Sequence, residues 1–302
     1  MNKCYEKIIC PICKSKKFEI LRENLKPNIT IAELKKFYSS SSDKKLIDQL
    51  SKCKNCDFIL LNPRVKKKIV LDSYTNNPDK EFVKHNNYRL KTFLFNFKRV
   101  IKFLTITQEK KLKILDIGTG GGTFLLAAKQ LGFEAHGLEP NKWLVNYIKK
   151  NLKIKAYQGT LEKIYLRKKF DLISFWDVFE HVIDLNKTLV ICKRLLKKNG
   201  VLLLNIPDHG SLARKLLGKS WPFYLNVHLY YFEKKTLNMI LNKHGFKYQN
   251  KITHFQLLPL KYILKRAGNY FKFFNFLNNK IPKKMDFGIW YNVGQNIYLY
   301  KK

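Results

Sequence analysis

A turn that contains four glycines is the feature that most constrains how this chain of 302 residues can fold. The apolar run at 114–117 leads into GTGGG at 118–122, and the following segment, TFLLAAKQL, repeats apolar residues at the spacing of a helix. Glycines let a backbone turn sharply and approach a ligand closely, because no side chain stands in the way. This order of strand, glycine turn and helix predicts a ligand site at the carboxyl end of a parallel strand.

The chain beyond the turn continues to alternate between strand and helix patterns. A second strand, EAHGLEP, contains Glu139 about 20 residues beyond the turn, where such folds place an acid that holds both ribose hydroxyls of an adenosine ligand. The alternation predicts an α/β fold, with a doubly wound parallel sheet and helices on both of its faces.

Asp116 stands two residues before Gly118, and LDIGTGGG therefore resembles motif I of class I S-adenosylmethionine-dependent methyltransferases. The resemblance covers about residues 111 to 255 and continues through GLEP, FDLISFWDVFEHV, LKKNGVLLLNIPD and HLYYFEKKTLNMILNKHGF. The chain looks most like the branch that contains ubiquinone-biosynthesis O-methyltransferases and methyltransferases of bacterial surface-sugar pathways. Some members of those sugar pathways also carry an N-terminal cysteine-pair zinc module. The resemblance implies a Rossmann-like seven-stranded sheet and a methyl-transfer activity.

The same resemblance implies contacts to the cofactor. Asp116 and the glycine turn would meet the amino-acid tail of S-adenosylmethionine, Glu139 would meet the ribose, and the stretch after the third strand would meet the adenine. The expected cofactor-binding residues are Asp116, Gly118, Thr119, Gly120, Gly122, Glu139, Pro140, Thr160, Leu161 and Asp177.

Three ionisable side chains, Asp177, Glu180 and His181, follow directly after an apolar strand in FDLISFWDVFEHV. We expect them beside the transferable methyl group, at the carboxyl end of the fourth strand. A hydroxyl acceptor must lose its proton as it attacks, and a positioned base can take that proton. We therefore expect catalytic roles for Asp177, Glu180, His181 and His228, with His181 as a general base that acts without a metal.

Two alternatives remain open for this group. The string D-x-x-E-H resembles the E-x-x-E-H metal motif of the small-RNA 2′-O-methyltransferases, which implies a divalent ion held by Asp177, Glu180, His181 and His228. The chain departs from that motif, because Asp177 stands where it has Glu and Val182 where it has a second His. In the other alternative, the acids cap a helix N-terminus, where the helix dipole favours negative charge.

Four of the six cysteines form two C-x-x-C pairs, Cys10 with Cys13 and Cys53 with Cys56. In a reducing cytosol, two such pairs can supply four thiolates to a tetrahedral zinc ion. A site with every position taken by cysteine leaves no room for a catalytic water, so we expect a structural, zinc-ribbon-like module. Redox-active or unrelated cysteines are the alternative.

The remaining segments set the expected domain boundaries. We expect the zinc-binding module at 1–66, linking or cap helices at 67–110, and the methyltransferase domain at 111–302, with a C-terminal insert at about 256–288. The insert is rich in Leu, Phe and Lys. We expect it to wall the acceptor pocket or to form a dimer contact; the alternative is a basic amphipathic helix on a membrane surface. The aromatic stretch at 221–232 is either another acceptor wall or core packing.

The net charge of +37 comes from 59 basic and 22 acidic residues. Lysines spread over solvated faces make no focused patch, so the charge alone does not indicate nucleic acid. From the resemblance to surface-sugar methyltransferases we expect a small-molecule or sugar acceptor in surface polysaccharide biosynthesis. An RNA-modifying methyltransferase or a zinc-containing nucleic-acid-binding protein is the alternative. The N-terminus lacks the apolar region of a signal peptide, and no apolar run is long enough for a membrane span, so we expect a cytoplasmic protein.

Overall fold

A seven-stranded sheet is the centre of the computed structural model, which describes residues 4–38, 44–74, 83, 86–104, 111–268, 273–280, 282 and 287–302. The strand order is β12-β15-β10-β9-β6-β7-β8. The strands are β6 (Lys113–Ile117), β7 (Glu134–Glu139), β8 (Lys155–Gln158), β9 (Phe170–Trp176), β10 (Leu196–Pro207), β12 (Lys247–Thr253) and β15 (Gln295–Lys301). Neighbours pair in parallel, except that β15 runs antiparallel to β10 and β12. This arrangement confirms the expected α/β fold with a Rossmann-like, doubly wound sheet.

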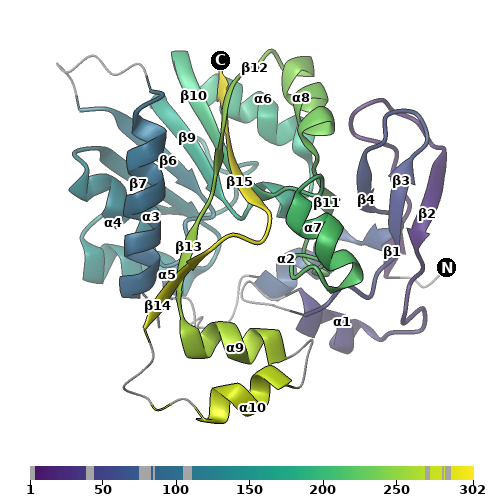
Figure 1. The fold of residues 1–302 in the computed structure, drawn as a ribbon. Coiled ribbons are helices and arrows are strands. Elements are labelled where there is room, and N and C mark those ends of the chain that lie inside the picture. Colours follow the sequence, from purple (N-terminus) through teal and green to yellow (C-terminus); the bar gives the residue numbers. More distant parts are fainter. Residues whose placement is uncertain are drawn as a thin grey trace.

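Helices cover both faces of this sheet (Figure 1). One face carries α3 (Asn86–Ile101), α4 (Thr123–Gln130) and α5 (Lys142–Tyr147), and the other carries α6 (Leu185–Leu195) and α8 (Lys234–Lys243). Successive residues of a strand point to opposite faces. In β10, Leu202 and Leu204 therefore join one buried core, and Leu203 joins the other.

A smaller antiparallel sheet lies at the N-terminal end of the chain, in the order β11-β4-β3-β2. Its strands are β2 (Phe18–Arg22), β3 (Leu50–Cys53), β4 (Ile59–Leu61) and β11 (Tyr230–Tyr231). Around it lie α1 (Ile31–Phe37), α2 (Lys67–Tyr74) and the paired strands β1 (Tyr5–Glu6) and β5 (Arg64–Val65). The fourth strand comes from the chain after β10, so the N-terminal region does not close its own sheet.

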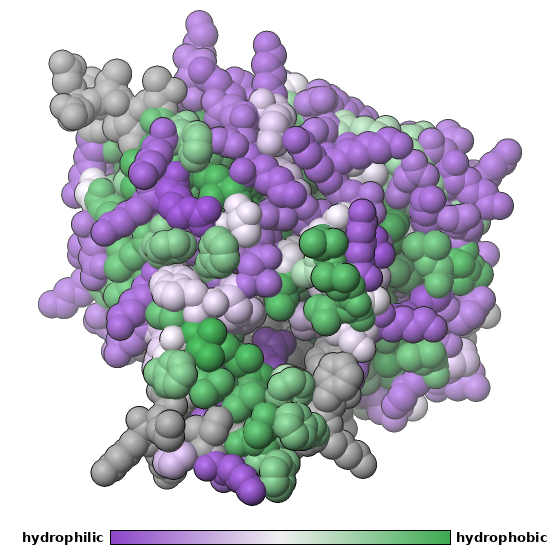
Figure 2. All heavy atoms as spheres, viewed as in Figure 1, coloured by the Kyte–Doolittle hydropathy of each residue, from purple (hydrophilic) through white to green (hydrophobic). Residues whose placement is uncertain are grey.

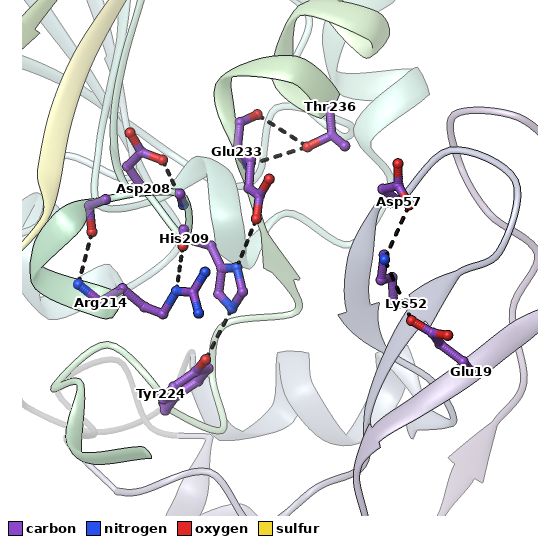
Figure 3. Close-up of polar contacts among 11 residues, drawn as sticks. Glu19, Lys52, Asp57, Asp208, His209, Arg214, Tyr224, Glu233 and Thr236 are labelled. Atoms are coloured by element: carbon purple, nitrogen blue, oxygen red, sulfur yellow. Dashed lines mark hydrogen bonds and ion pairs between the residues drawn. The ribbon is translucent and has the colours of Figure 1, made fainter. Parts of the chain in front are cut away.

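The segment between β10 and β11 connects the two sheets and contains α7 (Leu212–Leu217). Its centre is the buried ring of His209, which lies between the carboxylate of Glu233 at 3.2 Å and the hydroxyl of Tyr224 at 3.0 Å (Figure 3). The Arg214 side chain donates to the carbonyl oxygen of His209 at 2.6 Å. These contacts fix the path of the chain toward β11.

Exposed ion pairs lie along the edge of the small sheet. Lys52 approaches Glu19 at 3.5 Å and Asp57 at 3.2 Å (Figure 3), and Asp57 also accepts a hydrogen bond from Lys235 of α8 at 2.9 Å. Exposed pairs of this kind contribute little to stability, so the buried contacts described below are what hold the small sheet in place.

The C-terminal insert is built on a two-stranded antiparallel sheet of β13 (Gln256–Pro259) and β14 (Gly288–Tyr291). Between these strands lie α9 (Leu260–Gly268) and α10 (Phe273–Lys280), which pack against each other. Parts of the expected insert (269–272, 281 and 283–286) and of the expected linking segment (75–82, 84–85 and 105–110) lie outside the described residues. Within the described part of the chain, no helix combines the length and apolar character needed to cross a bilayer.

Candidate active site

A cavity lies where β6, β7, β8 and β9 reach their carboxyl ends. Nine of the ten residues expected to bind the cofactor line it, together with His181. These are Asp116, Gly118, Thr119, Gly120, Glu139, Pro140, Thr160, Leu161 and Asp177. The sheet therefore brings together turns that follow four different strands.

Gly122 is the expected residue that does not line the cavity, and its surroundings explain why. It precedes α4 with a φ of +77°, and a Cβ at this position would lie 2.8 Å from the side chain of Ile148. The glycine therefore allows a left-handed turn and close helix packing. Gly118, in contrast, lines the cavity with a φ of +66°, and a Cβ there would lie 2.7 Å from the side chain of Val178.

Two carboxylates mark one part of the cavity. Asp116 accepts a hydrogen bond from the hydroxyl of Ser174 at 2.7 Å. Burial raises the pKa of Asp116 to about 7, and the charge of Glu139 adds to the rise. Glu139 accepts the backbone N–H groups of Gly120 at 2.9 Å and Asn141 at 3.0 Å, so it is fixed against the glycine turn.

Asp177 lies just after β9 with a φ of +55°, a conformation in which non-glycine residues are uncommon. Its Oδ1 accepts hydrogen bonds from Asn205 at 3.1 Å and from the side-chain amide of Gln295. Burial raises its pKa to about 7, while the positive charge of Arg89 opposes the rise. Strands β10 and β15 therefore hold this carboxyl at the cavity wall.

Glu180, His181 and His228 form a second cluster, whose potential ligand atoms all lie within 4.8 Å of one another. The Nε2 atoms of both histidines are 3.9 Å from Oε1 of Glu180. Within the described structure, neither oxygen of Glu180 nor Nδ1 of His181 has a hydrogen-bond partner. Asp177, which the sequence grouped with them, is not part of this cluster.

Burial controls the protonation of the cluster. It lowers the pKa of His181 to about 4 and that of His228 well below its usual value. Burial and the nearby Asp177 carboxylate raise the pKa of Glu180 well above its usual value. Both imidazoles are therefore neutral at pH 7, and a neutral imidazole offers one nitrogen lone pair to a proton or a cation.

The helix-capping alternative does not describe these acids. Glu180 and His181 lie in a short 3₁₀ turn, Phe179–His181, and the following helix, α6, starts at Leu185. The side chain of Asp184 caps that helix by accepting the N–H of Lys187 at 3.0 Å. Asp177 and Glu180 are thus free of a capping role.

His228 is placed by the N-terminal region. Its Nδ1 approaches the carbonyl oxygen of Phe223 at 2.8 Å. The next residue, Leu229, donates to the carbonyl of Glu180 and accepts from the N–H of Leu61 in β4, each at 3.0 Å. A single residue therefore connects the small sheet, the 3₁₀ turn and the histidine.

A buried polar network holds the same loop against the N-terminal region. Oδ1 of Asn226 accepts the N–H groups of Ile47 and Asp48, each at 3.0 Å, and its Nδ2 donates to Asp48 at 2.9 Å. Asp48 also accepts hydrogen bonds from Tyr5 at 2.7 Å and Tyr38 at 2.6 Å. We call this network the Asp48 clamp. Polar networks of this kind give a unique arrangement when every member is paired.

The four paired cysteines meet at the other end of the small sheet. Their Sγ atoms lie within 4.8 Å of one another, with 3.5 Å between Cys10 and Cys56 and between Cys13 and Cys53. A tetrahedron with metal–sulfur bonds of about 2.3 Å has edges of about 3.8 Å, which is close to these distances. The residue after each pair, Lys14 or Asp57, has a φ of +64°. The two hairpins thus share one geometry.

Several cavity residues were not expected from the sequence. Lys67 and Val70 of α2 and Arg89 and Phe93 of α3 also line the cavity. The amphipathic pattern of this region indicated helices that pack over the next domain, but not which side chains would face the ligand.

Neither expected acceptor wall contributes to the lining. Among the described residues, no cavity-lining residue comes from 256–288 or from the aromatic stretch at 221–232. Trp221 is instead buried and donates to the carbonyl of Val293 at 2.7 Å, so core packing explains this aromatic.

Comparison with known proteins shows similarity to methyltransferases. The sequence profile of a family described as a methyltransferase domain matches residues 84–251. Two relatives are ubiquinone biosynthesis O-methyltransferases. The protein from Bradyrhizobium diazoefficiens is 31% identical over a match that covers 36% of this chain and 46% of its own length. The protein from Pelagibacter ubique is 35% identical over a match that covers 32% of this chain and 42% of its own length. This chain therefore matches less than half the length of these relatives.

A solved structure shares the fold. The crystal structure of a candidate methyltransferase from Bacillus halodurans aligns with 68% of this chain and 98% of its own length. The TM-score is 0.50 and the sequence identity is 13%, so the similarity concerns the fold alone.

Proposed function

The chain belongs to the methyltransferase domain family, and from this we propose that it transfers the methyl group of S-adenosylmethionine to an acceptor bound at the cavity. Two groups of side chains converge on this one cavity, and their convergence carries the proposal. Asp116 and Glu139 line one part, while His181 lines another and adjoins Glu180. The first group suits the polar ends of the cofactor, and the second suits removal of a proton from the acceptor.

The residues present fit S-adenosylmethionine. Because burial raises the pKa of Asp116, a cationic amino group beside it would favour the ionised carboxylate. Glu139 lines the same cavity, and a carboxylate can accept hydrogen bonds from two ribose hydroxyls. Thr160 and Leu161 also line the cavity, and we assign the adenine contact to them. The cofactor supplies a methyl group on a sulfonium, which is already an activated electrophile.

His181 acts on the acceptor as a general base. The acceptor oxygen forms a bond to the methyl carbon while the carbon–sulfur bond breaks, and its proton moves to the neutral imidazole. Oε1 of Glu180 lies 3.9 Å from Nε2, and the positive charge of the imidazolium opposes the rise in the pKa of Glu180 and so favours a carboxylate beside it. Asp177 lines the cavity nearby and holds its shape through Asn205 and Gln295.

We propose a hydroxyl of a small molecule or sugar as the acceptor, within surface polysaccharide biosynthesis. The O-methyltransferase names of the relatives support an oxygen acceptor, and a carbon acceptor is the alternative. An RNA-modifying enzyme or a nucleic-acid-binding protein is the other alternative for a chain with a net charge of +37. Retention on immobilised RNA that falls steeply with salt would favour that alternative.

A divalent cation is the second interpretation of the acceptor cluster. Three potential ligands within 4.8 Å, with both oxygens of Glu180 unpaired, favour this interpretation. Glu180, His181 and His228 would hold the ion, which would lower the pKa of a bound acceptor hydroxyl. A chelator distinguishes the two, because only the cation interpretation requires loss of activity and its recovery with a divalent metal.

For the N-terminal region, we propose one structural zinc ion on Cys10, Cys13, Cys53 and Cys56. The measured Sγ separations support it, and four cysteine ligands leave no open position for catalysis. We also propose the division into a module at 1–66, linking helices at 67–110 and a methyltransferase domain at 111–302.

Calorimetric titration and a labelled-methyl assay test the function. We expect the protein to bind S-adenosylmethionine and its demethylated product, and to transfer labelled methyl groups to a member of a panel of nucleotide sugars, phenols and RNAs. Absence of cofactor binding would end the methyltransferase proposal. Binding with transfer only to RNA would replace the proposed acceptor class.

A further inference from the structure

Two short helices present large apolar side chains to solvent. On α7, Leu212 and Leu216 are 70% and 78% exposed and lie one helical turn apart, so they point in the same direction. On α10, Phe273 and Phe276 are 63% and 55% exposed. Figure 2 shows hydrophobic side chains gathered over the places that α7, α9 and α10 occupy in Figure 1. We call Leu212, Leu216, Phe273 and Phe276 the apolar face.

The two segments of the chain that carry the apolar face contain basic residues and no acidic ones. None of the 22 acidic residues falls within 209–232 or 256–285. The described basic residues in these segments are Arg214 and Lys215 on α7, Lys219 just after it, Lys261, Lys265 and Arg266 on α9, and Lys280 at the end of α10. The ammonium of Lys280 lies 4.5 Å from the ring centroid of Phe276, so cationic and apolar groups are interleaved.

This combination matches the chemistry of a lipid surface. A helix in a membrane interface buries apolar side chains among the acyl chains, while its Lys and Arg side chains contact anionic headgroups. Among the described residues, the four of the apolar face are absent from the cavity lining, so the methyl acceptor does not account for their exposure. Grouped apolar side chains on a protein surface usually mark an interaction site.

We propose that the apolar face docks the protein on the surface of a bilayer that contains anionic lipid. Leu212 and Leu216 enter the interface from α7, and Phe273 and Phe276 enter it from α10. The basic residues around them meet the headgroups and make the interaction sensitive to salt. This proposal does not depend on the methyl-transfer proposal, because no cavity residue takes part in it.

Co-sedimentation of the full-length protein with vesicles tests the docking. We expect the protein to sediment with vesicles of phosphatidylcholine and phosphatidylglycerol, to sediment poorly with phosphatidylcholine alone, and to be released by salt. A Leu212→Glu/Leu216→Glu double variant should lower the bound fraction about tenfold or more, because two carboxylates would have to enter the interface. Val190→Glu is the matched control, since Val190 is 58% exposed on α6, and it should bind like the wild type.

Two double variants test how much the lysines contribute to vesicle binding. Lys215→Gln/Lys219→Gln should weaken binding to the anionic vesicles, whereas Lys168→Gln/Lys169→Gln, at the amino end of β9, should not. Circular dichroism confirms that each variant is folded, which is expected because every altered side chain is at least partly exposed.

Three results would overturn the proposal. The first is a wild-type protein that stays in the supernatant with anionic vesicles. The second is a Leu212→Glu/Leu216→Glu variant that binds as well as Val190→Glu. The third is a wild-type dimer in analytical ultracentrifugation that the double variant converts to a monomer, without vesicle binding by either; this result would assign the apolar face to a second copy of the chain.

Discussion

The two sides of the cavity are built in different ways. The cofactor side comprises Asp116 to Gly121, Thr123, Glu139, Pro140, Thr160 and Leu161, which lie at or just after the carboxyl ends of β6, β7 and β8. The acceptor side comprises His181, which lines the cavity, together with Glu180 and His228, which adjoin His181 outside the lining. Its third member reaches the site only because the loop before β11 is held by the N-terminal region through Leu61 and the Asp48 clamp.

The cofactor side and the acceptor side therefore depend on different parts of the chain. The cofactor side needs only the large sheet and its turns, because Glu139 is fixed by backbone groups of Gly120 and Asn141. The acceptor side also needs the N-terminal region, whose stability we attribute to the clamp and to the proposed zinc ion. Changes in the N-terminal region should therefore reduce methyl transfer while leaving cofactor binding intact.

The largest expected effect comes from removing the proposed base. His181→Ala should lower turnover on the identified acceptor by roughly 10²- to 10⁴-fold, which is the usual contribution of general acid–base catalysis. Cofactor affinity should change little. Steady-state kinetics and calorimetry measure the two quantities, with His244→Ala as the control. Full activity of His181→Ala would leave the cluster without a catalytic role.

Loss of the proposed zinc ion gives the next effect. Cys53→Ser should remove the bound zinc, from one ion per chain to none, and should destabilise the N-terminal region because structural zinc contributes directly to folding. Metal analysis of a reduced sample checks the ion, and Cys192→Ala should retain it. A wild-type protein without zinc would refute this part of the account.

Glu139→Ala tests the opposite side. The lost contacts to two ribose hydroxyls should weaken cofactor binding by about 1.5 to 3 kcal/mol, or roughly 10- to 150-fold. The zinc content should remain one ion per chain, because the N-terminal region is untouched. Glu134→Ala, at the start of β7 and away from the cavity, is the control. Equal affinity in both variants would remove Glu139 from the cofactor site.

A variant of the Asp48 clamp tests whether the acceptor side can be disturbed without the cofactor side. Asn226→Leu leaves the buried Asp48 with one donor fewer and two N–H groups unpaired, which should cost about 1 to 3 kcal/mol of stability for each group left unpaired. Thermal unfolding measures this loss, and the exposed Asn242→Leu should unfold like the wild type. If Asn226→Leu weakened cofactor binding as strongly as it lowered turnover, the two sides would not be separable.

The smallest effect is a pH dependence. The free protein holds a proton on Asp116 with a pKa of about 7, and an amino group of the cofactor favours the ionised form. Binding therefore releases a proton, and affinity should fall by up to about tenfold per pH unit as the pH drops below 7. Titrations across this range should show a flatter dependence for Asp116→Asn. An equally steep dependence in that variant would assign the proton to another group.

The same difference explains how far the sequence could predict the site. The glycine turn and Glu139 act within short stretches whose spacing reflects strand and helix lengths. The resemblance that these stretches carry implied ten cofactor residues, of which nine line the cavity. The grouping of Glu180, His181 and His228 rested on a resemblance, which also added Asp177 to the cluster. Nothing in the local sequence indicated that Asp48 would pair with Asn226, because their contact joins segments far apart in the chain.

The fold shows the same limit. The resemblance implied the seven-stranded sheet, and only its central strands β6, β9 and β10 stand out as buried apolar runs. The pairing of β11 with β4 in the small sheet could not be predicted, because nothing in the sequence around Tyr230 and Tyr231 favours β4 as a partner. For the insert that contains α10, the sequence left the acceptor pocket, a dimer contact and a membrane surface open, because an amphipathic pattern does not tell which partner covers the apolar side. No exposed apolar surface was predicted for α7.

One calorimetric experiment tests the account most directly: titration of S-adenosylmethionine into the wild type and into Cys53→Ser, side by side. The account predicts that both proteins bind the cofactor with similar affinity, since the cofactor side forms without the N-terminal region, whereas only the wild type transfers the methyl group. Failure of the wild type to bind would contradict the methyltransferase function. Binding by the wild type but not by Cys53→Ser would contradict the separation of the two sides.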